Sequence, residues 1–174
     1  MAAIGLPLSS GMIDDIKIRG DAQALSAAIA QAKLTSAAKF THSRVFANLT
    51  TNSYRLQIWN RTGTPGWVNA SDEMLLSDRS QFGFGPVTAP PPNTIVSLAQ
   101  APQCRDDLDV AISGTACLIF NSRGISVLST GPPATTQGLF LTGPSGVYGI
   151  FLGATGRLQV WRTTQTAASS WRQQ

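Results

Sequence analysis

Apolar residues recur at three- and four-residue steps from Ser9 to about Phe40, which predicts one long helix. Most residues on its buried face are small, so the helix can lie close to a sheet. This face consists of Ile18, Ala22, Leu25, Ile29, Ala32, Ser36 and Phe40. Met12, Ile13 and Ile16 project to the opposite side at about 100° per residue. Two interpretations stay open: the helix contacts something outside its domain here, or its first turn is frayed.

After residue 40 the pattern changes from helical to alternating, which predicts strands. The first two candidates are SRVFANL and SYRLQIW, joined by a polar turn at residues 50–52. A further strand is expected at NTIVSLA. Two strand–turn patterns follow, in ACLIFNSRGISVLS and in GLFLTGPSGVYGIFLGATGRLQVWRTT. The prolines of QFGFGPVTAPPPNT exclude a central strand, so we expect an edge or a surface loop there.

One long helix followed by seven or eight short strands predicts an α+β fold, with the helix packed on an antiparallel sheet or sandwich. The 174 residues suit a single domain. Within it, residues 1–40 would form the helical part and residues 41–174 a β-rich head. A hydrophobic content of 43% with only 13% charged residues excludes a disordered chain and fits a turn-rich, extracellular type of surface.

The net charge of +4 is not concentrated in any run of basic residues, so we favour a mildly basic surface without a polyanionic partner. A group of basic and aromatic residues near the C-terminus could still contact nucleic acid by pairing with phosphates and stacking on bases. It consists of Arg157, Trp161, Arg162, Trp171 and Arg172. Strand alternation places Trp161 and Arg162 on opposite faces, so that one can be in the core while the other is solvated.

Candidate catalytic chemistry is sparse. His42 is the single histidine, no G-x-S-x-G motif accompanies it, and we interpret it as a boundary polar residue. We therefore predict no enzyme, no cofactor and no metal. Asp106, Asp107 and Asp109 could ligate Ca²⁺, but they lack the spacing and the glycine of a calcium loop, which favours a solvated acidic turn.

The two cysteines, Cys104 and Cys117, lie close together in the sequence. In an oxidising compartment they could form a disulfide that closes a short loop. In the cytosol they would be buried thiols instead. Together with one histidine they are too few for a structural zinc site.

Residues Met1–Leu8 are apolar, and no Lys or Arg precedes Lys17, so the pattern of a secretory signal is missing. Eight residues are also too few to cross a bilayer. The stretch is typical of the end of a longer hydrophobic element.

The sequence resembles type IV pilin-like proteins, and more narrowly minor pseudopilins of the GspH/FimT type. The resemblance rests on IDDIKIRGDAQALSAAIAQAKLTSAAKF, LIFNSRGISV and VYGIFLGATGRLQVWR. Such proteins begin with a long hydrophobic helix that anchors them in the inner membrane and later packs in a filament core. Their cleavage glycine followed by Phe-Thr-Leu-Ile-Glu does not occur here, so the resemblance implies a truncation with Met1 as the initiator.

The resemblance implies a non-enzymatic structural subunit of a type II secretion or type IV pilus machine, at or near the filament tip. Its partners would be other pilin or pseudopilin subunits, contacted through the N-terminal helix. The full-length form would span the bacterial inner membrane once, with the head in the periplasm or on the filament. Because that compartment is oxidising, the resemblance also implies a Cys104–Cys117 disulfide.

Two alternative functions stay open: a DNA-binding minor pilin for DNA uptake, and a free-standing β-rich binding or adhesion domain. For DNA, Arg157 and Arg162 would be the contact residues. DNA-binding members of the family tend to carry G-R-x-R in this segment. Here Gln159 stands where the second arginine would be, which makes nucleic acid a less favoured partner.

Overall fold

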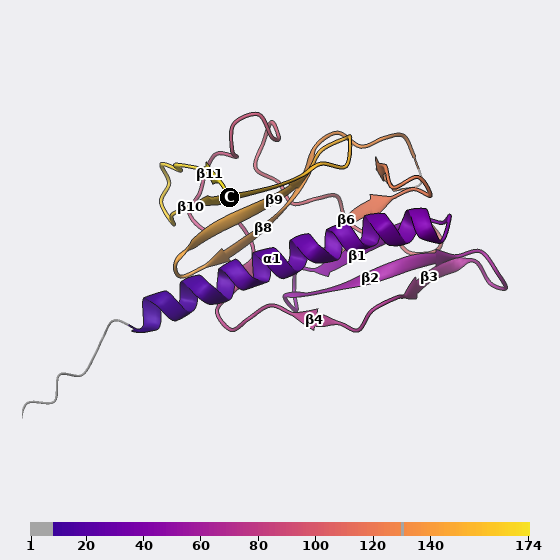
Figure 1. Cartoon of the computed structure of the whole chain (residues 1–174), viewed down its shortest axis with the longest axis horizontal. Helices are drawn as coiled ribbons and strands as arrows, with labels where there is room; N and C mark the ends of the chain where they lie inside the picture. Colours follow the sequence, from indigo (N-terminus) through magenta and orange to yellow (C-terminus); the bar gives the residue numbers. More distant parts are fainter. Residues whose placement is uncertain (1–8, 130) are drawn as a thin grey trace, which may run out of the picture.

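The computed structural model describes residues 9–129 and 131–174, so the predictions for Met1–Leu8 lie outside the described residues. Within this part, one helix and eleven short strands form the predicted α+β fold, with the helix packed on antiparallel sheets (Figure 1). None of the helical residues described makes an apolar stretch sufficient to span a bilayer.

Helix α1 (Ser9–Ala38) buries the face that the sequence pattern predicted, except at its last position. Ile18, Leu25 and Ile29 are fully buried, whereas Phe40 lies beyond the helix and is 75% exposed. The extension of the helix to Phe40 was therefore wrong.

The backbone explains this end of the helix. Phe40 adopts a positive φ of 50°, and the N–H of Thr41 donates to the carbonyl of Ser36 at 3.2 Å. This is the bonding pattern of a Schellman cap, in which a residue in the left-handed region ends the helix. Glycine normally takes that position, so a phenylalanine there gave no signal in the sequence.

The first sheet has the strand order β3-β2-β1-β6-β7, and β4 pairs with the first two residues of β2. Its strands are β1 (Ser43–Asn48), β2 (Ser53–Asn60), β3 (Gly66–Asn69), β4 (Met74–Leu75), β6 (Thr115–Phe120) and β7 (Ser126–Val127). The predicted hairpin of SRVFANL and SYRLQIW is β1 and β2, with Ser43 opposite Ile58.

The second sheet has the order β11-β10-β9-β8-β5. Its strands are β5 (Gln81–Phe82), β8 (Gln137–Gly143), β9 (Gly146–Leu152), β10 (Leu158–Thr163) and β11 (Arg172–Gln173). The short strand β5 lies at the edge, as the following prolines required. The turns predicted at residues 143–146 and 154–156 join β8 to β9 and β9 to β10.

The strand predicted at NTIVSLA does not form. This segment belongs to an irregular stretch between β5 and β6, and Val96 within it is fully exposed. Its other large apolar residues, Ile95 and Leu98, pack against the cluster of Val87, Phe140, Val147 and Phe151. The apolar run therefore covers a sheet and does not join one.

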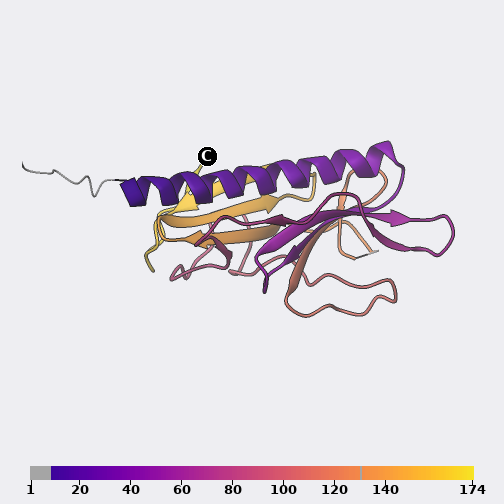
Figure 2. The same cartoon turned by 90° about the horizontal axis from the view of Figure 1, so that it is seen from below.

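Helix α1 is shared by the two sheets and lies along one face of both (Figure 2). The main core fills the space between them, with Leu25 and Ile29 from the helix, Leu118 from the first sheet and Leu139 and Ile150 from the second. The opposite face of each sheet is covered by irregular chain. Residues around 83–100 cover the second sheet, and the loop closed by Cys104 and Cys117 covers the first.

Candidate functional site

The first turns of α1 present three apolar side chains to solvent. Met12 and Ile16 lie about one turn apart and are each 67% exposed, and Ile13 is 49% exposed. They project away from the side of the helix that buries Leu25, as the pattern predicted. Figure 1 shows that the helix begins beyond the end of the second sheet. Exposed apolar side chains gathered in this way are typical of a contact surface.

The other side of these turns is tied to the head by ion pairs. Asp14 accepts a hydrogen bond from the Arg79 guanidinium at 2.9 Å, and Asp15 pairs with Arg162 of β10. Neighbouring helix positions differ by about 100°, so the two carboxylates leave the helix in different directions and reach different segments of the head. The Asp14 side chain is 10% exposed and the Arg79 side chain 60%, so water reaches this pair mainly from the side of the arginine.

The Arg162 side chain also contacts a neighbouring strand of its own sheet. Its guanidinium carbon lies 5.7 Å from the ring centroid of Tyr148, its cross-strand partner on β9. Burial raises the pKa of Tyr148, and the positive charge of Arg162 opposes that shift. On the other side, Arg162 is paired with Arg172 of β11.

The structure does not bring the two proposed DNA contacts together. Arg157 is exposed in the turn before β10, whereas Arg162 is half-buried near the other end of that strand. Arg157 and Arg162 are five residue steps apart, which is about 16 Å along a strand, and odd and even positions point to opposite faces. Trp161 lies on the face opposite Arg162 and packs on the cluster around Phe140. The prediction that strand alternation places Trp161 and Arg162 on opposite faces of the sheet is confirmed.

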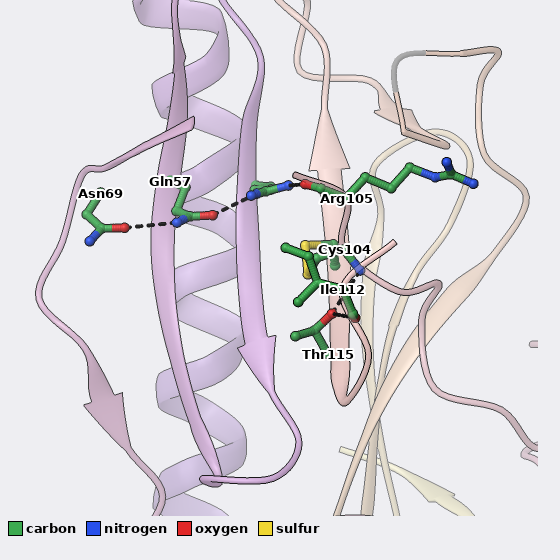
Figure 3. The surroundings of a disulfide bond; sticks show 8 residues. Gln57, Asn69, Cys104, Arg105, Ile112 and Thr115 are labelled. Atoms are coloured by element: carbon green, nitrogen blue, oxygen red, sulfur yellow. Dashed lines mark hydrogen bonds between the residues drawn. A yellow bond between two sulfur atoms is a disulfide. The ribbon is translucent and has the colours of Figure 1, made fainter. Parts of the chain in front are cut away.

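A second polar arrangement lies under the disulfide loop on the first sheet (Figure 3). Arg44 donates from Nε to the Gln57 side chain at 2.8 Å and from Nη1 to the carbonyl of Arg105 at 2.6 Å. Gln57 in turn donates to Asn69 at 2.9 Å. The Arg44 guanidinium lies 3.9 Å from the centroid of the Trp67 ring. Burial lowers the pKa of Arg44 to about 10, which leaves it charged at neutral pH.

The disulfide joins Cys104 and Cys117, so the loop between them is fixed to β6. Hydrogen bonds reinforce the closure: Ile112 N–H donates to the Cys104 carbonyl at 2.8 Å, and Cys104 N–H donates to the Thr115 hydroxyl at 3.1 Å (Figure 3). The loop covers Phe46 and Ile119 on the outer face of the sheet.

The acidic residues of this loop bind parts of the protein. Asp106 accepts from the backbone N–H groups of Leu108 and Val110, and Asp107 accepts from the N–H of Trp67 at 2.8 Å. Asp109 pairs with an arginine four residues before it. In the described ranges, 9–129 and 131–174, no group of three or more metal-binding side chains comes together. These carboxylates therefore stabilise the turn and hold the loop in place.

His42 lies at the helix-to-strand junction, where the sequence placed it. Burial, and then the charge of Arg61, lower its pKa.

Sequence reasoning missed two arginines, Arg44 and Arg79. Arg44 occupies an ordinary alternating position of a strand and Arg79 an irregular segment, so nothing in the pattern distinguished either from a solvated side chain.

Comparisons of the chain with protein-family models, with curated proteins and with solved structures found no match.

Proposed function

We propose that this chain is a non-enzymatic structural subunit, a minor pilin or pseudopilin of a type II secretion or type IV pilus machine. Its contact with neighbouring subunits is the apolar patch formed by Met12, Ile13 and Ile16 at the start of α1. The observation that carries the proposal is the two-sided character of these turns. One side is apolar and faces solvent, while the other is ion-paired to the head.

The partner that fits this patch is the apolar helix of another pilin-type subunit. Such a helix buries the three side chains, and burial of one large aliphatic side chain contributes about 1.5–3 kcal/mol. The ion pairs of Asp14 and Asp15 hold the helix against its own head, so the patch is presented in a fixed direction. The proposed location is the bacterial inner membrane, with the head in the periplasm or on the filament.

The test is site-specific photo-crosslinking in cells that assemble the machine. A photoreactive amino acid is introduced at Ile16, and a matched control carries it at Leu34. Leu34 is 69% exposed against 67% for Ile16. It lies 18 residues further along the same helix, which is five full turns, so it faces the same side. The two positions therefore differ only in their place along the helix.

We expect cross-links to pilin-type subunits from position 16 and none, or many fewer, from position 34. Equal cross-linking at both positions would show that the outward side of the helix is touched without preference for the patch. Cross-links from position 16 only to soluble enzymes or to nothing, in cells with an assembled machine, would overturn the proposal.

A further inference from the structure

Two arginines lie side by side on the second sheet. Arg162 of β10 and Arg172 of β11 are direct cross-strand partners. The side chains of such partners leave the same face of the sheet, with their Cβ atoms about 5 Å apart. Like charges in this arrangement repel each other and destabilise the pairing. A negative group between or beside them removes that cost.

Among the side chains of the described residues, one carboxylate pairs with either of these arginines, and its partner is Arg162. Asp15 reaches Arg162 from the helix. In the described part of the chain, no carboxylate oxygen comes within the 4.0 Å of an ion pair to the Arg172 guanidinium. Arg19 adds further positive charge, since it lies close enough to affect the pKa of Tyr148. The neighbourhood of the pair therefore keeps an excess of positive charge.

A hollow of about 390 Å³ opens at this pair. Both arginines line it, and the other lining residues are Thr163, Thr164, Ser170 and Gln174. Hydroxyl and amide groups can donate hydrogen bonds to the same oxygen atoms that a guanidinium binds. The hollow thus combines cationic and neutral donors and faces solvent, so a small ligand can enter.

We propose that this hollow binds one small oxyanion group, a phosphate or a carboxylate. A guanidinium presents its N–H groups as a planar fork that matches two oxygens of such a group, and these charge-assisted hydrogen bonds are stronger than neutral ones. Arg172, which pairs with no side-chain carboxylate of the described residues, supplies the main fork, and Arg162 supplies the second charge. The inference does not depend on the assembly role of α1.

The test is titration of the purified chain with sodium phosphate and, separately, with sodium acetate, at constant ionic strength, followed by NMR shifts of backbone amides in β10 and β11. The informative variant is Arg172→Gln, because Arg172 is exposed and its loss leaves no buried partner unpaired. The matched control is Arg123→Gln, which removes the same charge from an exposed turn between β6 and β7. Arg172→Lys keeps the charge and removes the fork.

We expect saturable shifts that weaken roughly tenfold or more in Arg172→Gln, less in Arg172→Lys, and not at all in Arg123→Gln. Saturation with phosphate alone assigns a tetrahedral oxyanion, and saturation with acetate assigns a carboxylate. Shifts that respond equally to all three variants indicate an adventitious ion only and overturn the proposal. Binding of a DNA duplex through Arg172, with no response to either small anion, overturns it as well.

Discussion

Two glycines of the second sheet make room for aromatic rings. Gly138 lies opposite Phe151, and Gly149 lies opposite Phe140, so each ring faces a position without a side chain. The two rings meet edge to face, with centroids 5.2 Å apart and an interplanar angle of 88°. A Cβ on Gly149 would lie 2.6 Å from a carbon of the Phe151 ring. The stack therefore depends on these glycines.

At the residue scale we predict opposite effects for two Gly→Ala substitutions. Gly149→Ala lowers the free energy of unfolding by about 1–3 kcal/mol, because the methyl group overpacks a buried ring. Gly20→Ala raises it by about 0.5–1 kcal/mol, since Gly20 lies on the exposed side of α1 with nothing within 4 Å of an added Cβ. Urea denaturation of both variants measures the two changes. A neutral Gly149→Ala would contradict the packing described.

Residue identity alone could not predict these roles. Apart from the strand predicted at NTIVSLA, which does not form, the pattern located the long buried strands correctly, because alternation and apolar runs follow from which face is buried. It could not tell that Gly138 and Gly149 face aromatic rings, since that depends on the register of β8 against β9. The capping role of Phe40 was hidden for a similar reason. It depends on a backbone conformation that phenylalanine seldom adopts.

At the scale of elements, α1 holds the segment that carries the chain from one sheet to the other. Residues 76–80 connect β4 in the first sheet to β5 in the second. Asp21 accepts hydrogen bonds from the backbone N–H of Ser77 at 3.2 and 3.1 Å and from its hydroxyl at 2.8 Å. Asp14 binds Arg79 in the same segment. The helix therefore fixes the crossing as well as the core.

We predict that Asp21→Ala lowers the free energy of unfolding by about 1–3 kcal/mol, because the N–H and hydroxyl of Ser77 lose their acceptor in a partly buried place. Asp21→Asn keeps one acceptor oxygen and costs less. The control is Asp72→Ala, a substitution of an exposed carboxylate that is expected to stay within about 0.5 kcal/mol of the parent. Thermal or urea unfolding provides the measurement. Equal stabilities for Asp21→Ala and Asp72→Ala would argue against the fastening role.

The candidate site was predictable only in part at this scale. The exposed patch at the start of α1 follows from helical periodicity, which is local in the sequence. The partner of Arg162 does not, because Asp15 lies on a different element and 147 residues away. Strand alternation was enough to separate Trp161 from Arg162. It could not show that NTIVSLA covers a sheet instead of joining one.

At the scale of the whole molecule, the disulfide holds a loop over the outer face of the first sheet. The bond joins residues 13 apart, and closing a loop of this length in the unfolded chain is worth about 3 kcal/mol on the chain-entropy model. We predict that the double substitution Cys104→Ala and Cys117→Ala lowers the free energy of unfolding by about that amount. Urea denaturation compares it with the parent protein.

The oxidation state itself is measured by intact mass after alkylation in denaturant. Without a reductant we expect no alkylated thiol in protein purified from an oxidising compartment, and two after reduction. Two alkylated thiols in the unreduced sample would rule the bond out. The stability difference in the double variant would then have to come from packing around Phe46 and Ile119.

The strands of the two sheets alternate along the chain. After β4 the chain leaves the first sheet for β5, returns for β6 and β7, and leaves again for β8 to β11. During synthesis the N-terminal part of the chain becomes available first. Strand β1 can then pair with β2 at once, but its other edge stays unpaired until β6, about 70 residues further along, has been made. An unpaired strand edge is a template for pairing with other chains. The edge of β1 that later pairs with β6 is therefore the place where an incomplete chain is most open to misassembly.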